Sequence, residues 1–489
     1  MSAPQSLADV VDRLPGVRVL CVGDVMLDRF IYGRVERISP EAPIPVIRVD
    51  REQAMLGGAG NVVRNLVALG ARVEFVSVVG KDAAGRDVMR LVGELPGVEP
   101  HLLVDPQRPT TIKSRFVADG HQLLRADQES SAALDGVTAR DIQGVIAEAV
   151  RDCDIVVLSD YAKGVLAEDT TRQVIAAARK AGKAVLIDPK GSNWSRYKGA
   201  SILTPNRPEL ALAAGAAVDD AAAIAAAARK LIRTLQLDAI LCTRGKDGMA
   251  LVGRTGKPHL LPASAREVFD VSGAGDTAIA AFAAALAAKA DLPTAALLAN
   301  VAAGIVVGKV GTAVVHPDEI KRELVHEANV ATEAKILTAA QAADQTTRWR
   351  RLGLKVGFTN GVFDLLHPGH VTLLRKARAA CDRLIVGMNS DASVKRLKGK
   401  DRPIQDEAAR ATVLASLASV DGVVVFGEDT PLQLIQQIRP ELLVKGADYT
   451  IDKVVGAREV QSWGGKVVLV DLEQGHSTTR LVGKASGKP

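Results

Sequence analysis

Cysteine, aromatic residues and long apolar runs are all scarce in this chain of 489 residues. The cysteines lie far apart with no Cys-x-x-Cys pair, so neither a zinc knuckle nor a disulfide framework is expected. We predict that all four are buried thiols: Cys21, Cys153, Cys242 and Cys381. The longest alanine-rich stretch, residues 277–288, falls short of the roughly 18 apolar residues that a membrane span requires. The first residues carry acidic side chains and no apolar segment behind a basic one, so we expect no secretory signal and a cytoplasmic protein.

Aromatic residues make up only 3% of the chain, which leaves few rings on which nucleic-acid bases could stack. Basic residues exceed acidic ones, 62 to 56, and the formal net charge is +6. Because the Lys and Arg residues are scattered along the sequence, this excess favours anionic small molecules over nucleic acid as ligands. A nucleic-acid-binding or regulatory protein that retains inactive enzyme motifs is the alternative from another functional class.

Apolar, β-branched runs alternate with alanine-rich helical stretches along most of the sequence, which is typical of a parallel sheet with crossover helices. Two segments, residues 31–49 and 110–127, break this pattern with prolines or strict alternation, and they predict a small β lid. A polar, helix-prone linker at residues 318–348 precedes a second series of strands. We therefore expect an α/β protein with two domains, residues 1–317 and 349–489.

Small residues precede a long alanine-rich helix in the first half of the chain. Gly273, Ala274 and Gly275 would let backbone N–H groups approach an anion at the positive end of this helix, which predicts an anion hole. Asp276 follows at the helix entrance. It could cap the helix, or it could accept a proton from a substrate hydroxyl that attacks a phosphorus atom.

Further polar and glycine-rich motifs follow other predicted strands, at the edge where open sheets bind ligands. They are GDVMLD, which contains Asp24 and Asp28, GGAGN at residues 57–61, NRPE at residues 206–209, and TRGKDG from Thr243 onward. Any one of them could be a turn, but five sites after successive strands favour a ligand site.

In GGAGN, in NRPE and above all in SGAGD, the first domain resembles the ribokinase family of carbohydrate kinases. The resemblance implies a sheet with helices on both faces, a β lid, and phosphoryl transfer from ATP with Mg²⁺. It implies that Asp276 is the base and that the backbone from Gly273 to Asp276 holds the transferring phosphoryl group. The implied sugar contacts are Asp28, Gly57, Gly58 and Asn61. The implied nucleotide and phosphate contacts are Lys190, Asn206, Arg207, Pro208, Glu209, Thr243 and Gly245, with Mg²⁺ organised near Asn206 and Glu209.

Two histidines, His367 and His370, stand at a predicted helix start after a buried strand. Pro368 fixes the entry of the helix, and Gly369 lets a phosphate approach the backbone. Both imidazoles could then face an anion and stabilise the charge that builds on a phosphate under attack. A metal site is the competing interpretation, but no third ligand stands at a recognisable spacing.

HPGH after a strand ending in TNGVFD resembles the signature of the nucleotidyltransferase superfamily typified by the cytidylyltransferases. The resemblance implies a smaller Rossmann-like domain in which a phosphate oxygen attacks the α-phosphate of a nucleoside triphosphate and pyrophosphate leaves. His367 and His370 would stabilise the transition state. The other implied contacts are Thr359, Asn360, Lys398, Ser477, Thr478 and Thr479.

Three positions near this motif set are open. Val482 stands where the superfamily has an arginine, and Arg480 occupies the variable position, so the resemblance assigns no role to Arg480. Lys445 is either a phosphate ligand or a solvated surface lysine.

A sugar kinase joined to a nucleotidyltransferase resembles the bacterial family of bifunctional enzymes of ADP-heptose synthesis, also in ERISPEAPIPV, DYAKGV and SVKRLKG. The resemblance implies phosphorylation of D-glycero-β-D-manno-heptose 7-phosphate at O1 and adenylyl transfer from ATP to heptose 1-phosphate, for the lipopolysaccharide core. We identify no phosphatase signature, because DVMLD lacks the DxDx[TV] spacing, and we expect a separate phosphatase to act between the steps. HPGH does not distinguish ATP from CTP, so another sugar kinase fused to a CTP-dependent transferase is the alternative.

The lid raises two further expectations. Its basic residues Arg34, Lys113 and Arg115 could bind the distal phosphate of a sugar phosphate, although we slightly favour solvated side chains. The apolar strand at residues 43–49 predicts a homodimer that pairs through the lid, since exposed strand edges are usually covered.

Overall fold

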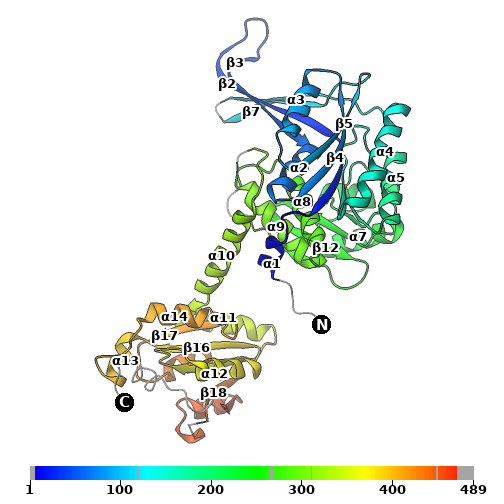
Figure 1. The fold of residues 1–489 in the computed structure, drawn as a ribbon. Coiled ribbons are helices and arrows are strands. Elements are labelled where there is room, and N and C mark those ends of the chain that lie inside the picture. Colours follow the sequence, from blue (N-terminus) through cyan, green and yellow to red (C-terminus); the bar gives the residue numbers. More distant parts are fainter. Residues whose placement is uncertain (1–5, 119, 265–267, 310, 448–449, 471–489) are drawn as a thin grey trace, which may run out of the picture. The chain divides into compact units, whose positions relative to one another are not determined.

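The computed structural model describes residues 6–118, 120–264, 268–309, 311–447 and 450–470. The chain divides into two compact units, Met1–Leu324 and Val325–Pro489, whose elements Figure 1 labels. Among the described residues, none of the helices combines the length and the apolar character needed to span a membrane. All four cysteines are buried and free, as predicted.

A nine-stranded sheet forms the centre of the first unit, and its strands pair in parallel except at one edge, where β12 is antiparallel to both β11 and β13. In spatial order the strands are β13 (His259–Leu261), β12 (Met249–Gly253), β11 (Ala239–Thr243), β10 (Ile202–Leu203), β9 (Ala184–Asp188), β8 (Ile155–Ser159), β1 (Arg18–Gly23), β4 (Arg72–Gly80) and β5 (Val98–Asp105).

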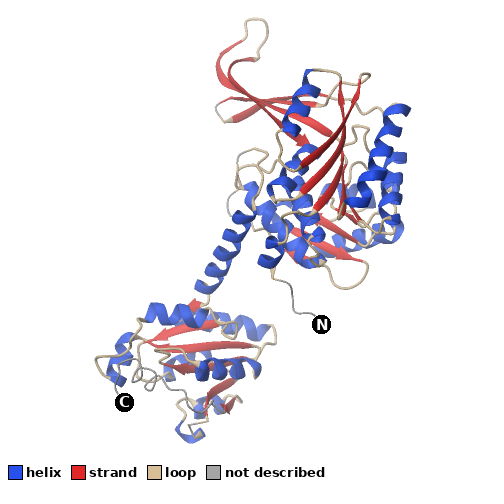
Figure 2. Cartoon of the chain, viewed as in Figure 1, coloured by secondary structure: helices blue, strands red, loops and turns tan. Residues whose placement is uncertain are grey.

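Helices cover both faces of this sheet, because successive residues of a strand point to opposite sides (Figure 2). In β1, Val19 and Cys21 join one apolar cluster, while Leu20 and Val22 join the other. The first cluster packs against α1 (Leu7–Asp12), α2 (Ala59–Ala68), α3 (Ala83–Gly93), α8 (Ala274–Ala287) and α9 (Leu292–Val307). The second packs against α4 (Gly136–Asp152), α5 (Glu168–Lys180), α6 (Arg207–Ala214) and α7 (Ala221–Leu235). Two 3-10 turns, η1 (Ser195–Tyr197) and η2 (Gly245–Asp247), complete the unit.

A second sheet projects from this unit and confirms the predicted β lid (Figure 1). Its strand order is β3-β2-β6-β7, with β2 (Val25–Ile38), β3 (Pro45–Gly58), β6 (Ile112–Ala118) and β7 (His121–Gln128). β2 and β6 pair in parallel, and their register puts Asp28 opposite Lys113 and Phe30 opposite Arg115. The lid therefore brings two basic residues beside the end of the strand that carries Asp28.

The second unit contains a six-stranded parallel sheet, which confirms the predicted Rossmann-like domain. Its strands, in spatial order, are β14 (Ile336–Leu337), β17 (Gly422–Phe426), β16 (Arg383–Asn389), β15 (Val356–Gly361), β18 (Leu442–Gly446) and β19 (Lys466–Val470). Its helices are α11 (Ala339–Arg351), α12 (Pro368–Ala379), α13 (Asp391–Lys398), α14 (Glu407–Ala415), α15 (Leu432–Ile438) and α16 (Ala457–Ser462), with a 3-10 turn η3 (Ile451–Lys453). Helices again cover both faces, since Leu384, Val386 and Met388 pack on one side and Ile385 on the other.

The segment expected to be a linker contains regular structure. It begins within α10 (Pro317–Glu333) and continues through β14 and α11. β14 pairs with β17, and Ala342 of α11 is buried in the apolar core of the second unit. Part of this segment therefore belongs to the second unit, as an edge strand of its sheet and a helix packed against that sheet.

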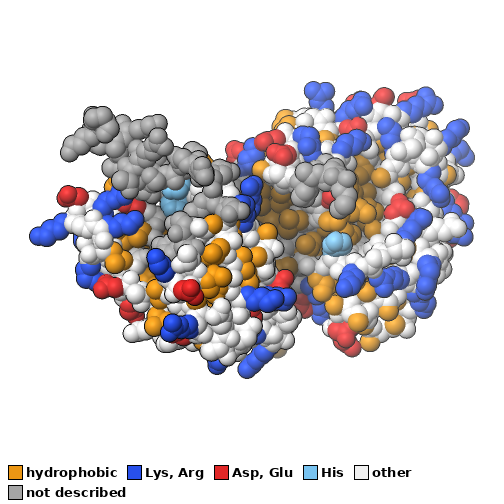
Figure 3. Space-filling model, turned by 90° about the horizontal axis from the view of Figure 1, so that it is seen from below, with side chains coloured by type: hydrophobic (Ala, Val, Ile, Leu, Met, Phe, Trp, Pro, Cys, Tyr) orange, Lys and Arg blue, Asp and Glu red, His pale blue; other side chains and the backbone are white. Residues whose placement is uncertain are grey.

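The basic excess of the chain is dispersed on the visible surface. On the face that Figure 3 shows, Lys and Arg side chains are scattered among acidic, apolar and neutral ones and form no continuous stripe. Proteins that bind along a nucleic-acid backbone typically carry a continuous basic stripe, which this face lacks.

Candidate active sites

The first unit contains a cavity of about 780 Å³ at the carboxyl end of its parallel strands. That volume is typical of small-molecule sites. The cavity brings together the predicted nucleotide and anion-hole residues from four places in the sequence: Lys190, Asn206, Arg207, Pro208, Glu209, Thr243, Gly245, Gly273, Ala274, Gly275 and Asp276.

The start of α8 opens on this cavity and has the geometry expected of an anion hole. Gly273 is the N-cap residue and has a left-handed backbone, with φ +81°. A Cβ atom at this position would lie 2.8 Å from Asn61 Nδ2, so both the backbone conformation and the close approach require glycine. The positive end of α8 therefore meets the cavity without an intervening side chain.

Asp276 lies in the first turn of α8 and does not cap the helix, because the N-cap is Gly273. Its carboxylate accepts hydrogen bonds from two other elements: Asn61 Nδ2 donates to Oδ2 at 2.8 Å, and Tyr161 Oη donates to Oδ1 at 2.7 Å. Burial raises the pKa of Asp276 to about 6, although these two donors oppose the rise. The side chain is thus ionised at neutral pH, with a pKa suited to accepting a proton.

Asp28 and the glycines of GGAGN form the side of the site next to the lid. A Cβ atom at Gly57 would lie 2.4 Å from Asp28 Oδ2, and one at Gly58, where φ is +58°, would lie 2.5 Å from the carbonyl oxygen of Asp24. Asn61, the last residue of the motif, bonds to Asp276. Asn61 thus contacts the predicted base, and the charge of Asp28 acts on that base, while the two glycines lie beside Asp28 and Asp24.

The lid cations do not behave alike. Arg115 donates to Asp28 at 2.7 Å and its side chain is only 14% exposed, so the expectation of a solvated side chain is wrong there. Lys113 is half-buried, and burial is the main cause that lowers its pKa. Arg34, by contrast, is 64% exposed. The difference follows from the register of β6, which sets Lys113 and Arg115 beside the buried end of β2.

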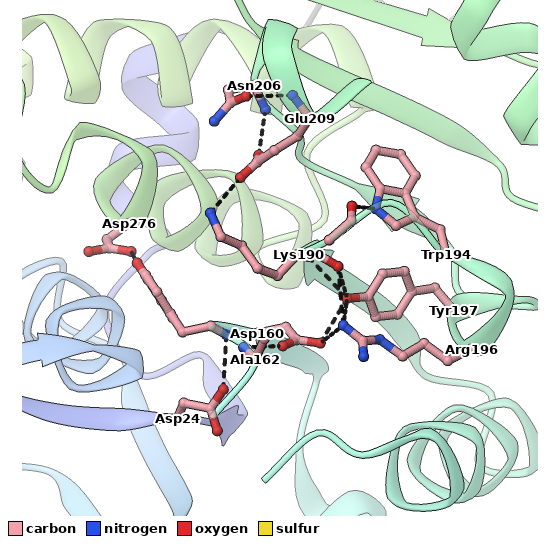
Figure 4. A network of polar contacts seen from close by, with 12 residues as sticks. Asp24, Asp160, Ala162, Lys190, Trp194, Arg196, Tyr197, Asn206, Glu209 and Asp276 are labelled. Carbon is pink, nitrogen blue, oxygen red and sulfur yellow. Dashed lines mark hydrogen bonds and ion pairs between the residues drawn. The ribbon is translucent and has the colours of Figure 1, made fainter. Parts of the chain in front are cut away.

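The NRPE motif caps a helix, a structural role that the sequence alone did not reveal beside the predicted ligand role. Asn206 and Glu209 form a capping box at the start of α6, in which each side chain accepts from the backbone N–H of the other. Glu209 also accepts from Lys190 Nζ at 2.9 Å (Figure 4). Arg207 is engaged as well, since it donates to Asp247 at 2.7 Å. Because Lys190 and Glu209 line the cavity, this ion pair is available to a bound phosphate or cation.

In the second unit, the two predicted histidines are stacked at the start of α12. Their ring centroids are 3.8 Å apart, and His367 is the N-cap residue. Phe363 packs edge-on against His370, with ring centroids 5.2 Å apart. Burial lowers the pKa of His370 to about 4, and the neighbouring His367 and Lys398 add to the effect. His370 is therefore a neutral ring at physiological pH, and the charge of Lys398 acts on it.

Buried polar atoms next to these rings point to a ligand. Within the described part of the chain, Thr359 Oγ1, Asn360 Oδ1 and His370 Nδ1 are buried and have no hydrogen-bond partner. Such atoms cost about 1–3 kcal/mol each when they stay unpaired, so a polar ligand here would restore the lost bonds. Among the described residues, no group of three His, Cys, Asp or Glu side chains could hold a metal ion.

Lys445 and Lys398 approach this site from neighbouring elements. Lys445 is half-buried on β18 and donates to the carbonyl oxygen of Asn360 at 3.0 Å, so the solvated-surface interpretation of this lysine is wrong. Lys398 ends α13, and its charge acts on His370. The remaining predicted contacts, Ser477, Thr478 and Thr479, lie outside the described residues, as do Arg480 and Val482.

The sequence assigned no role to several site residues, although Tyr161 lies within the string DYAKGV. Tyr161 contacts the predicted base, and Arg64 of α2 donates to Asn61 at 3.3 Å. In the second unit, the buried Arg410 donates to the carbonyl oxygen of Val362 and, at 2.6 Å, to Asp391, so it ties together the segments before α12 and α13. Each of these contacts either joins residues that are far apart in sequence or involves a residue outside the motifs discussed above.

Comparisons with known proteins agree with this division of the chain. The model of the pfkB family carbohydrate kinases matches residues 17–319, and the cytidylyltransferase-like model matches residues 358–481. Among solved structures, Arabidopsis thaliana ribokinase complexed with ribose and ATP has 23% identity and a TM-score of 0.51, and covers 63% of this chain and 99% of its own. Escherichia coli phosphofructokinase-2 has 20% identity and a TM-score of 0.55, with 64% and 99% covered. At these identities the two structures establish the fold of the first unit.

Curated relatives extend over the whole chain. The bifunctional protein HldE of Paramagnetospirillum magneticum is 59% identical, with all of both chains covered. Those of Acidiphilium cryptum and Rhodospirillum rubrum are 56% and 54% identical, covering 96% and 100% of this chain and 96% and 98% of their own. The chain therefore belongs to the HldE family of bifunctional proteins, with a pfkB-type carbohydrate kinase followed by a cytidylyltransferase-like nucleotidyltransferase.

Proposed function

We propose that this chain uses ATP twice in the synthesis of ADP-L-glycero-β-D-manno-heptose for the lipopolysaccharide core, in the cytoplasm, where ATP and sugar phosphates are available. The first unit phosphorylates D-glycero-β-D-manno-heptose 7-phosphate at O1, and the second transfers AMP to heptose 1-phosphate. The observation that carries this proposal is the match to bifunctional relatives over the full length, with a separate helix-start site in each unit. The alternative, a different sugar kinase fused to a CTP-dependent transferase, gains no support from these relatives.

In the kinase reaction, Asp276 is the base. The O1 hydroxyl of the sugar attacks the γ-phosphorus of ATP, the bond between that phosphorus and the ADP oxygen breaks, and the O1 proton passes to the Asp276 carboxylate. The start of α8 stabilises the charge on the transferring group, because its dipole and N–H groups face the cavity. Asp28 and Asn61 would orient the sugar from the lid side.

Mg²⁺ fits the residues of the nucleotide end of the cavity. This ion keeps several waters and is usually held by one or two carboxylates together with substrate phosphates. Glu209 and Asp188 both line the cavity, and burial together with the charges of Asp276 and Glu209 raises the pKa of Asp188 well above its usual range. A divalent cation would favour the ionised form of Asp188. When bound, it would neutralise charge on the ATP phosphates, with Asn206 fixing Glu209 through the capping box.

In the transferase reaction, a phosphate oxygen of heptose 1-phosphate attacks the α-phosphorus of ATP, and pyrophosphate leaves. A phosphate needs no base to become a nucleophile, which agrees with a neutral His370 imidazole as a donor. His367 and His370 would stabilise the charge on the attacked phosphate, while Lys398 and Lys445 would bind the charged reactants. Thr359 and Asn360 would offer this ligand buried polar atoms that have no partner in the structure.

A separate phosphatase has to remove the 7-phosphate between the two steps. One string, DCDIV at residues 152–156, does fit the DxDx[TV] pattern, contrary to the sequence analysis. Its position speaks against this role, because both aspartates of the string precede β8, at the sheet end opposite the ligand cavity, and Asp154 accepts from the backbone N–H of Arg18 at 2.8 Å. The carboxylate thus serves to join two strands.

A first prediction separates the two reactions. Asp276→Asn should lower the turnover of the kinase by about 10²–10⁴-fold because the base is lost, and leave adenylyl transfer unchanged. His370→Ala should lower adenylyl transfer by about 10²–10³-fold and leave phosphorylation unchanged. Both reactions are assayed on each purified variant with saturating ATP. Loss of both activities in either variant would contradict two independent sites.

A second prediction concerns the order of steps. The purified chain, supplied with heptose 7-phosphate and ATP, should accumulate the 1,7-bisphosphate and form ADP-heptose only after a sugar-bisphosphate phosphatase is added. Phosphorus NMR of the mixture distinguishes the two products. ADP-heptose formed without the added phosphatase would show that this chain removes the 7-phosphate itself.

A third prediction tests whether Lys113, the half-buried lysine of the lid, binds the 7-phosphate of the sugar. Lys113→Ala should raise the KM for heptose 7-phosphate by about tenfold, equivalent to 1.4 kcal/mol, and leave the KM for ATP unchanged. Arg34→Ala, on the exposed part of the same lid, is the matched control and should change neither value. Equal effects of the two substitutions would assign Lys113 no role in binding.

A fourth prediction addresses the proposed homodimer through the lid. The described lid exposes apolar side chains that a partner lid could cover: Ile38, Ile44, Val49, Leu123 and Leu124. Light scattering at micromolar concentration should give the mass of two chains, and Leu124→Asp should shift it toward one. A monomeric native chain under these conditions would refute lid pairing.

A further inference from the structure

Residues 160–165, just after β8, are fixed to the sheet by Asp24. This carboxylate is 1% exposed at the end of β1. Its Oδ2 accepts from the backbone N–H groups of Tyr161 at 2.9 Å and Lys163 at 3.0 Å, and its Oδ1 accepts from that of Val165 at 3.0 Å. Three bonds from one buried carboxylate leave this segment little freedom to shift.

A second buried carboxylate fixes the same segment from its other side. Asp160 accepts from the N–H of Ala162 at 2.8 Å, from Tyr197 Oη at 2.7 Å and from Arg196 at 2.8 Å (Figure 4). Ala162 has a left-handed backbone with φ +56°, which is unfavourable for a residue with a Cβ atom. Such a conformation persists only where the surrounding contacts determine it, as they do here.

The result of both attachments is the placement of one hydroxyl group. Tyr161 lines the cavity, and its Oη donates to Asp276 Oδ1 at 2.7 Å. Burial and the Asp276 charge raise the pKa of Tyr161 well above its usual range, so the phenol keeps its proton and acts as a donor. The other oxygen of Asp276 is held by Asn61. The carboxylate is thus fixed from both ends by neutral groups.

We propose that Tyr161 is a positioning residue of the kinase reaction, whose hydroxyl orients the Asp276 carboxylate and keeps it ionised to accept the sugar proton. This inference rests on the proposed role of Asp276 as the base. It adds a residue that lies in no glycine-rich or helix-start motif of the chain.

Several charged or titratable groups act on Asp276, and their effects have to be separated. Asp28 raises its pKa, whereas Lys113, Asn61 and Tyr161 lower it. The thiol of Cys21 and the carboxyl of Asp188 also lie within range of its charge. Among these groups, Tyr161 is the donor that can be removed without deleting a charge or one of the proposed sugar contacts, because phenylalanine keeps the ring.

The sign of the effect follows from the hydrogen bond. Removing a donor from a carboxylate destabilises its ionised form and therefore raises its pKa. The base is then protonated at pH values where the native base is free, so the acid limb of the profile of kcat against pH moves to higher pH. At pH values far above this limb, Asp276 is ionised in both proteins and the difference shrinks.

The experiment is the pH profile of phosphorylation by Tyr161→Phe between about pH 5 and pH 9. We expect the acid limb to move up by about one pH unit, with most of the native kcat recovered at the alkaline end. The KM values for both substrates should stay within about twofold of native. Adenylyl transfer by the same preparation, together with its thermal unfolding, verifies that the variant is folded and correctly quantified.

Tyr197→Phe is the matched control, because it removes another buried phenol from the same network that touches Asp160 and not Asp276. It should lower the thermal stability and leave the acid limb in place. An acid limb that stays in place in Tyr161→Phe, or an equal shift in Tyr197→Phe, would overturn the proposal. If the native chain itself fails to phosphorylate heptose 7-phosphate, the proposed function is wrong. That outcome is distinct from an active native chain whose Tyr161→Phe variant keeps its acid limb at the native pH, which refutes the role of Tyr161 alone.

Discussion

In the proposed function, both halves of this chain have to stabilise phosphate charge at the point of reaction. Each unit offers the N-terminus of a helix for this purpose, at α8 and at α12, where the peptide dipoles supply a positive potential. The requirement for close backbone approach explains the small residues before α8. The sheets, their two-sided helical cover and the lid can all be understood as the framework that keeps these helix ends in place.

The same physical effect prepares both reacting groups, with opposite results. Desolvation disfavours the charged form of a side chain, so it raises the pKa of the Asp276 carboxyl and lowers that of the His370 imidazole. For Asp276 the outcome is a carboxylate that stays ionised at neutral pH and binds a proton more readily than an exposed one. For His370 it is an uncharged donor, which can bind a developing charge without adding a proton-transfer step. In the proposed reactions, one unit therefore uses proton abstraction and the other electrostatic stabilisation.

Much of each site could be predicted because its residues are adjacent in sequence to a strand end or a helix start. SGAGD and HPGH are such strings, and both lie at helix starts as predicted, although the N-cap of α8 is Gly273 and not Asp276. The contacts that sequence reasoning missed depend on tertiary neighbours. Tyr161 meets Asp276 across 115 positions, and Arg115 meets Asp28 across 87. No local pattern marks a tyrosine or arginine whose partner is set by strand order, so the solvated interpretation of Arg115 was the natural error.

The short strand β14 has a practical consequence for dividing the protein. It forms the outermost position of the second sheet, beside β17, and α11 follows it into the apolar core. A fragment beginning at residue 349 would lack both elements, leaving the backbone groups of β17 open to pairing with other chains and part of the core open to water. Expression of the carboxyl-terminal half as a separate, non-aggregating protein therefore calls for a start upstream of Ile336.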